Sequence, residues 1–188
     1  MRQWNRWYWL LFCGLLCWVA STPPHAQAQV RTIELREMIQ SAETIFAGRV
    51  TQVRSGLDQR GDIVTHTTFT VEANVKGANS MTLTIKQFGG RWNGRTLLIP
   101  HLRYFQKGER VMVMLYPVSD LGFTSPVGLS QAAWTVSNGM VTGITAASLK
   151  QIPALLKKYG IAAATTTTVS IPVATFSALV RDIQKGGE

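Results

Sequence analysis

The sequence contains only two cysteines, Cys13 and Cys17, and both lie close to its start. Beyond them the chain has no thiol, which excludes cysteine catalysis, cysteine-ligated metal clusters, covalent haem attachment and disulfides from most of the protein. Neither cysteine follows the small residue that a lipidation site requires, since Phe12 and Leu16 precede them. The sequence therefore predicts a domain that folds without disulfides and carries no lipid anchor.

No apolar run reaches the roughly 20 residues of a typical membrane-spanning helix. The run Trp7–Ala20 follows a basic start that includes Arg2, and the small-residue site Ala26-Gln27-Ala28 lies soon after it. A basic start, a short apolar run and an A-x-A site together make a secretory signal peptide. We expect residues 1–28 to be removed near Ala28-Gln29, which predicts a secreted or periplasmic protein with no transmembrane segment. A short uncleaved anchor is the alternative.

Acidic residues are also scarce, with 10 Asp and Glu against 19 Lys and Arg. Without residues 1–28, which hold two arginines, the remaining 160 residues carry 17 basic and 10 acidic residues and a net charge of +7. A chain of that length is enough for one domain with a buried core. Its charge favours anionic partners, while the expected export signal argues against nucleic acid.

The middle of the chain is patterned as β-strands. Alternation predicts strands over Ile45–Val53, Ile63–Val75 and Met81–Gln87, with a bulge at Gly48 and with Met81, Leu83 and Ile85 facing inward. Gly89-Gly90 ends this pattern, and we expect residues 91–109 to be irregular. Arg110–Tyr116 is apolar on both faces, as in a central strand. Asn138-Gly139 predicts a hairpin with a type I′ turn between Ala133–Ser137 and Met140–Ile144.

Helices are predicted before and after these strands. The first has one apolar stripe of Leu35, Met38, Ile39 and Ala42, with Thr32 as its expected N-cap. The second ends at Gly160 and either begins near Ile152 or is kinked at Pro153. The last contains Phe176, Leu179, Val180 and Ile183. The Thr-rich run Ala162–Val169 is either a linker or a strand.

The order of these elements predicts a mainly β fold. We expect a small OB-like β-barrel, closed or partly open, of five to six antiparallel strands, with a helix before it and one or two C-terminal helices. The expected organisation is a signal peptide over 1–28, the barrel over 29–146, and a helical segment over 147–188 that includes a Thr-rich linker over 162–169.

Short motifs over residues 32–144 follow the order seen in one class of secreted domains. They are Ala42–Val50, Phe69–Glu72, Val75–Gly77, Gln87–Gly90, Phe105 with Gly108–Val111, and Pro126–Leu129 before Trp134. Together they resemble secreted netrin-like and tissue-inhibitor-of-metalloprotease-like domains. The resemblance implies an OB-like five-stranded barrel with a packed helix, and a binding role toward another protein such as a secreted peptidase.

The chain departs from that class at the position that matters for protease inhibition. The animal inhibitors begin with a cysteine whose amine and carbonyl chelate the protease zinc. Here the expected mature chain begins at Gln29-Val30 and has no cysteine. The resemblance therefore implies a fold and a binding role, and that inhibitory mechanism transfers to no residue of this sequence.

The sequence carries no signature of catalysis. His66 and His101 are the two imidazoles of the expected mature chain, and His66 shares a strand face with Glu72, but no metal-ligand spacing such as HExxH is present. Gly128–Ala132 lacks the second glycine of a nucleophile elbow and is better explained as a turn. Gly89-Gly90 before Arg91 fits the end of a strand better than an anion cradle. We therefore expect no enzyme, no metal and no cofactor.

The most suggestive feature is a basic segment with aromatic residues. Between Lys86 and Arg110 lie six basic residues and one acid, Glu109. Trp92 lies in a loop rich in glycine and arginine, where exposed Trp and Arg are typical interface anchors. We expect Arg91, Trp92, Arg95 and Arg103 to form the partner-binding surface. The alternative is a solvated rim, with Phe88, Tyr104 and Phe105 in the core; Trp134 is expected in the core.

Three functions follow from these observations. The first is a secreted non-catalytic module that binds another extracytoplasmic protein, including a peptidase, through the basic aromatic loop. The second is a module that binds anionic glycan or a membrane surface, because a basic patch attracts either. The third, a small metal-dependent or serine hydrolase, lacks the residue constellation that such chemistry needs.

Overall fold

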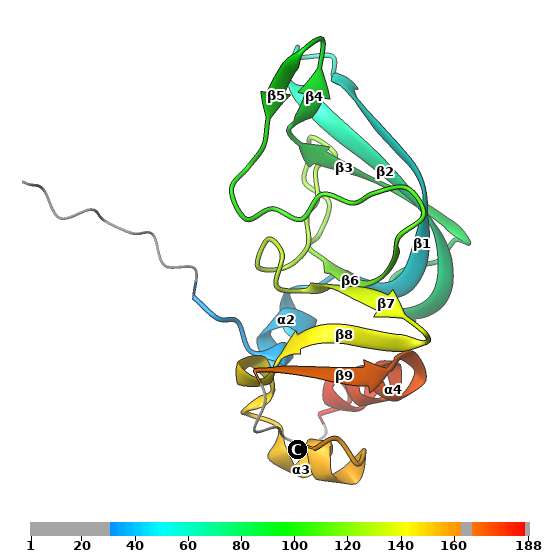
Figure 1. Ribbon diagram of the computed structural model, residues 1–188, viewed down its shortest axis with the longest axis vertical. Coiled ribbons are helices and arrows are strands. Elements are labelled where there is room, and N and C mark those ends of the chain that lie inside the picture. Colours follow the sequence, from blue (N-terminus) through cyan, green and yellow to red (C-terminus); the bar gives the residue numbers. More distant parts are fainter. Residues whose placement is uncertain (1–30, 163–166, 187–188) are drawn as a thin grey trace, which may run out of the picture. The chain divides into compact units, whose positions relative to one another are not determined.

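The computed structural model divides the chain into two units, Met1–Arg31 and Thr32–Glu188. It describes residues 31–162 and 167–186, so the fold is that of the second unit (Figure 1). The expected signal peptide and both cysteines lie outside the described residues. Among the residues that are described, no helix has the length and hydropathy needed to cross a membrane.

Seven strands form one antiparallel sheet in the order β3-β2-β1-β6-β7-β8-β9. Their bounds are β1 Thr44–Leu57, β2 Ile63–Lys76, β3 Thr82–Phe88, β6 Arg110–Leu115, β7 Ala133–Ser137, β8 Met140–Thr145 and β9 Thr168–Pro172. The prediction of a mainly β, antiparallel fold is confirmed. The sheet is open, with β3 and β9 as its edges, and it has seven strands rather than five or six.

The central strand β6 separates two hydrophobic clusters. Val111 and Val113 point into a cluster with Phe46 and Phe69, while Met112 points into the cluster on the opposite face of the sheet. All of these side chains are fully buried. Successive side chains of β6 therefore pack into the two clusters in turn, as predicted for a strand that is covered on both faces.

The bulge expected at Gly48 is present, because the register between β1 and β2 shifts between Ala47 and Gly48. A Cβ at Gly48 would lie 2.6 Å from the carbonyl oxygen of Thr70, so no larger residue fits the bulge. One prediction for the neighbouring strand is wrong. Met81 precedes β3 and is 81% exposed, so it does not face inward as Leu83 and Ile85 do.

The α-helices of the described residues lie where the sequence predicts them: α2 Leu35–Ser41, α3 Pro153–Lys158 and α4 Val173–Gln184. A 3₁₀ turn that the sequence analysis does not predict, η1 Ala146–Leu149, precedes α3. The N-cap of α2 is Glu34 rather than Thr32. Pro153 is the first residue of α3, which selects the start near Ile152 over a kink, since proline at that position loses no helical hydrogen bond.

The C-terminal segment joins the same sheet and the same core. Part of the Thr-rich run, from Thr168, forms β9 beside β8, while residues 163–166 lie outside the described residues. The ring of Phe176 on α4 meets the ring of Trp134 on β7 edge to face at 5.3 Å between centroids. Trp134 is therefore a core residue, as predicted, and α4 covers the β7–β9 part of the sheet (Figure 1).

Candidate functional site

A second, two-stranded sheet forms a hairpin where the sequence predicts irregular structure. Its strands are β4 Gly90–Trp92 and β5 Arg95–Leu97, and Trp92 pairs with Arg95 across a two-residue turn. Asn93 and Gly94 have φ angles of 45° and 75°, the left-handed values that a type I′ turn requires. The prediction of irregular structure is therefore wrong for these residues, and the Asn-Gly dipeptide is the signal that would have corrected it.

The base of the hairpin is held on both sides by Tyr104. Its hydroxyl donates to the carbonyl of Phe88, just before β4, and accepts from the N–H of Ile99, just after β5, at 2.6 and 3.2 Å. Thr65 adds a second attachment, because its hydroxyl donates to the carbonyl of Gly89 at 2.7 Å. These bonds fix the hairpin relative to strands β2 and β3.

Gly89 allows this close approach. It has a φ of 88°, and a Cβ there would lie 2.4 Å from the Tyr104 hydroxyl and 2.5 Å from the Leu97 carbonyl oxygen. Glycine is therefore required both by the backbone conformation and by the lack of space. The Gly89-Gly90 pair ends β3 and begins β4, which confirms the strand-end interpretation.

Trp92, Arg95 and Leu97 lie on one face of the hairpin. Directly paired residues of an antiparallel ladder share a face, and Leu97 lies two residues beyond Arg95 on the same strand. All three line a cavity of about 440 Å³ whose opposite wall is formed by the end of β1 and the start of β2, with Leu57 and Asp62. We call this cavity the hairpin groove.

Arg91 and Arg103 lie elsewhere. Arg91 pairs with Thr96, so its side chain points to the face of the hairpin opposite the groove. Arg103 donates to both carboxylate oxygens of Glu109, at 3.1 and 3.2 Å, and its guanidinium lies 5.6 Å from the ring centroid of Phe105. Of the four expected binding residues, the structure therefore brings only Trp92 and Arg95 together in the groove.

Three of the six basic residues from Lys86 to Arg110 are neutralised by ion pairs. Lys86 is paired with Asp58 at 2.8 Å, Arg103 with Glu109 at 3.1 Å, and Arg110 with Glu72 at 2.7 Å. The other three basic residues are Arg91, Arg95 and Lys107, and each is exposed and has no ion pair within the described part of the chain. Two of these three flank Trp92, so the unneutralised charge concentrates on the hairpin.

The solvated-rim alternative holds for only part of this segment. Phe105 is buried in the core and packs edge to face on Phe69, as that alternative predicts. Phe88 is 37% exposed and lies 6.0 Å from the ring of Phe123. Tyr104 is half-buried and serves the hairpin base. Trp92 is 44% exposed, which sets it apart from the core aromatics.

Three exposed leucines add apolar surface in this region, two of them beside Trp92. Leu57, Leu97 and Leu98 are 51%, 39% and 50% exposed, and the first two line the hairpin groove. Isolated exposed leucines are ordinary, but several grouped around an exposed tryptophan are typical of an interaction site. Sequence pattern does not indicate this role for Leu57, because it lies in a polar turn and has no apolar neighbour in sequence.

A second cavity lies on the other side of the β1–β2 turn and also contains Leu57. Its volume is about 580 Å³, and its lining includes Asp58, His66, Lys86 and Asp120. The hydrogen bond from Lys86 is the main cause that lowers the pKa of Asp58, so this carboxylate is anionic at neutral pH. Lys86 and Asp58 are therefore engaged with each other across this cavity.

The two histidines in the described part of the chain are exposed. His66 lies on β2, and His101 lies in the segment after β5 with a left-handed φ of 62°. Among the described residues, no three His, Cys, Asp or Glu side chains are grouped as metal ligands. Ser130 lies in the turn expected for Gly128–Ala132, where its N–H donates to the carbonyl of Gly128 at 2.9 Å.

Comparison with known proteins finds no matching family model, no matching curated protein and no matching solved structure. The resemblance to netrin-like domains stays a prediction from sequence motifs.

Proposed function

We propose that this protein is a secreted or periplasmic, non-catalytic binding module for another extracytoplasmic protein. Its contact surface is the groove-facing side of the β4–β5 hairpin, formed by Trp92, Arg95 and Leu97. The observation that carries the proposal is the exposed tryptophan paired across the turn with an arginine that has no ion pair in the described part of the chain. Tryptophan and arginine are enriched among the few residues that dominate the binding energy of protein interfaces.

The rigidity of the hairpin supports this role. A type I′ turn and the two hydrogen bonds of Tyr104 hold the hairpin backbone that carries Trp92. A backbone that is already ordered loses little conformational entropy on binding, so more of the contact energy contributes to affinity.

The chemistry of the groove favours a protein over a uniformly anionic surface. Its lining combines apolar Leu57 and Leu97 with the cation of Arg95 and the carboxylate of Asp62. A protein segment offers apolar and charged side chains at separate positions, whereas a lipid headgroup layer or an acidic glycan would place negative charge against Asp62 as well. The sequence resemblance adds a secreted peptidase to the candidate partners.

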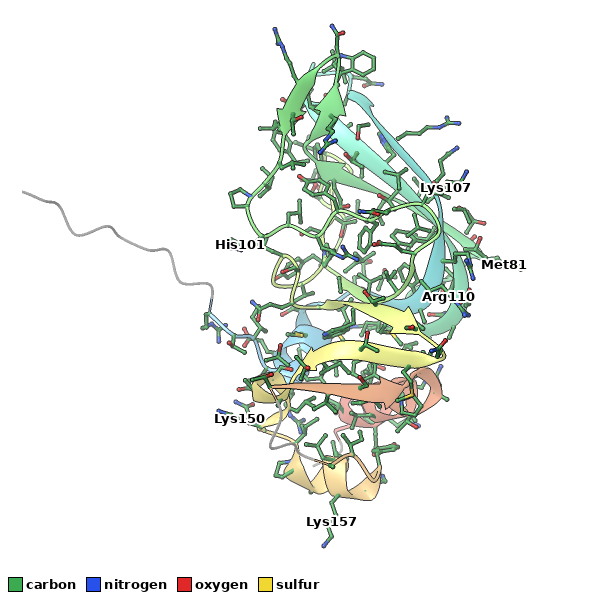
Figure 2. The ribbon with its side chains drawn as sticks, in the orientation of Figure 1. Met81, His101, Lys107, Arg110, Lys150 and Lys157 are labelled. Atoms are coloured by element: carbon green, nitrogen blue, oxygen red, sulfur yellow. The ribbon has the colours of Figure 1, made fainter. Side chains whose placement is uncertain are left out.

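The test is capture from an envelope extract with the exported protein as bait. We expect Trp92→Ala and Arg95→Glu to lose a captured protein that wild type retains, because both residues lie on the contact face. Met81→Ala and Lys107→Glu are the matched controls, since both side chains are exposed and Figure 2 shows both away from the hairpin. Capture that is independent of Trp92, or that is lost equally in the controls, overturns the proposal.

An anionic surface is the second candidate function, favoured by Arg91 and Arg95 on opposite faces of the hairpin without ion pairs in the described structure. Sedimentation with phosphatidylglycerol vesicles, against phosphatidylcholine vesicles, tests it. Binding to the anionic vesicles that the double variant Arg91→Glu with Arg95→Glu abolishes, without any protein capture, would establish this second function in place of the first.

A further inference from the structure

The outer edge of β5 is an open strand edge beside the hairpin groove. The hairpin packs on strands β1 and β2 through β4. Every residue of β5 is exposed, and β4 is its one strand partner among the described residues. A strand edge of this kind presents backbone groups to which another extended chain can pair.

The register identifies which backbone groups face that edge. In a hairpin with a two-residue turn, the residues that flank the turn exchange both hydrogen bonds, and the next pair exchanges none. Trp92 and Arg95 are the flanking pair, so the N–H and C=O of Thr96 point away from β4. The Leu97 carbonyl agrees with this alternation. Its oxygen points toward β4, since it lies 2.5 Å from the position that a Cβ of Gly89, just before β4, would occupy.

We propose that the partner contributes an extended segment that adds a third strand to β5, with its backbone bonded to Thr96. This inference rests on the proposed function and specifies how the partner is recognised. The added strand presents alternate side chains to the groove face, where Arg95 and Leu97 are its direct neighbours.

The side chains on that face determine the preferred segment. The residue opposite Arg95 is acidic, because that arginine has no ion pair within the described residues and a cross-strand pair of opposite charge is favourable. The residue opposite Leu97 lies two positions along the added strand and is apolar, since its direct neighbour on the groove face is Leu97. The expected ligand is thus an extended peptide with one acidic and one apolar residue separated by a single residue.

A second copy of the chain is a poorer occupant of this edge. Pairing β5 antiparallel with itself through Thr96 would set Arg95 opposite Leu97 of the second copy and leave it without a counter-charge. Two chains that each carry a net charge of +7 after residue 28 also repel one another. An acidic peptide avoids this repulsion and supplies the missing counter-charge.

The test uses the exported wild-type protein and a pool of short blocked peptides. Each peptide holds an acidic and an apolar residue separated by serine or threonine, and a matched pool carries lysine in place of the acid. We expect the acidic pool to bind and to shift the amide resonance of Thr96, with the lysine pool about tenfold weaker or more. Failure of the acidic pool to bind overturns the proposal.

Two changes separate strand addition from contact by side chains alone. Thr96→Pro removes the outward N–H, while Thr96→Val keeps both backbone groups; we expect about tenfold weaker binding for the first and wild-type binding for the second. Since proline can also disturb β5, an N-methyl group on the peptide amide that pairs with the Thr96 carbonyl is tested on the wild-type protein. Full binding of the N-methylated peptide overturns strand addition.

The same variants distinguish this inference from the function on which it rests. If envelope capture requires Trp92 but survives Thr96→Pro in a folded protein, the binding function stands and strand addition is wrong. If capture does not require Trp92, the binding function itself fails. Concentration-dependent dimers that Thr96→Pro abolishes, with no peptide binding, would assign the edge to a second copy instead.

Discussion

The ammonium of Lys86 lies 2.8 Å from Oδ2 of Asp58 and joins strand β3 to the turn between β1 and β2. The other carboxylate oxygen, Oδ1, accepts from the N–H groups of Arg60 and Asp62 at 2.9 and 3.0 Å. One carboxylate therefore shapes the turn and attaches it to the sheet. Because that turn carries Asp62 and follows Leu57, this contact also positions one wall of the hairpin groove.

The Asp58 carboxylate predicts a specific pH dependence of stability. Its pKa is lowered, chiefly by the Lys86 hydrogen bond and against the opposing effect of burial. A lowered folded-state pKa stabilises the fold above the unfolded value, about 3.9, and this contribution is lost as the pH falls further through the folded pKa. We expect Asp58→Asn to unfold at lower urea than wild type at pH 7, and the difference to shrink below about pH 4. A constant difference across that range would contradict the assignment.

Gly89 predicts a large cost for one added methyl group. In Gly89→Ala the methyl meets Tyr104 and the Leu97 carbonyl at a φ of 88°, so we expect a loss of roughly 2–5 kcal/mol in unfolding free energy. Gly94→Ala is the matched control, because Gly94 has a φ of 75° but open space around it; its expected cost is about 1–2 kcal/mol. Urea unfolding of both variants measures the difference, and equal costs would show that the Tyr104 contact is unimportant.

The contact between α4 and the sheet predicts the effect of truncating its central aromatic residue. Phe176 is fully buried against Trp134, so Phe176→Ala removes a large side chain and leaves a cavity. We expect a loss of about 3–5 kcal/mol. Val118→Ala, at a position that is 62% exposed, should stay within about 0.5 kcal/mol of wild type. A small loss at Phe176 in urea unfolding would mean that α4 adds little to the core.

The two tryptophans beyond residue 28 should be distinguishable by fluorescence. Trp92 is 44% exposed and Trp134 is 5% exposed, so acrylamide should quench the first far more than the second. We expect Trp92→Phe to remove the longer-wavelength, quenchable part of the emission, and Trp134→Phe to remove the protected part. If acrylamide quenches the emission of the two variants equally, Trp92 is not more exposed to solvent than Trp134.

The predictable parts of the fold are those specified by local pattern. The alternation of Val111 and Met112 is enough to identify a strand buried on both faces, and Asn138-Gly139 specifies its hairpin through backbone conformation alone. Pro153 likewise marks a helix start because of its missing N–H. Whether the sheet closes into a barrel depends on whether its edge strands, β3 and β9, pair with each other. Residues so distant in sequence are not related by any local pattern.

The candidate site was harder to predict because its determinants are short or distant in sequence. Strands β4 and β5 have three residues each and show no alternation, so only the Asn93-Gly94 turn reveals them. Charge neutralisation is not local either: Arg110 is paired by Glu72, on another strand. Arg103 is paired by Glu109, six residues away, but sequence alone does not say which cation of the segment this acid neutralises. The excess charge on the hairpin is therefore evident only in the folded structure.

The position of β6 between the two hydrophobic clusters has a consequence for how the protein unfolds. Val113 and Met114 are adjacent in the chain but belong to different clusters, so neither cluster can lose this strand without exposing the other. The half of the sheet that supports the hairpin and the half covered by α4 are thus thermodynamically coupled. We expect one cooperative transition, in which damage beneath α4 lowers the fraction of molecules that present an intact binding surface.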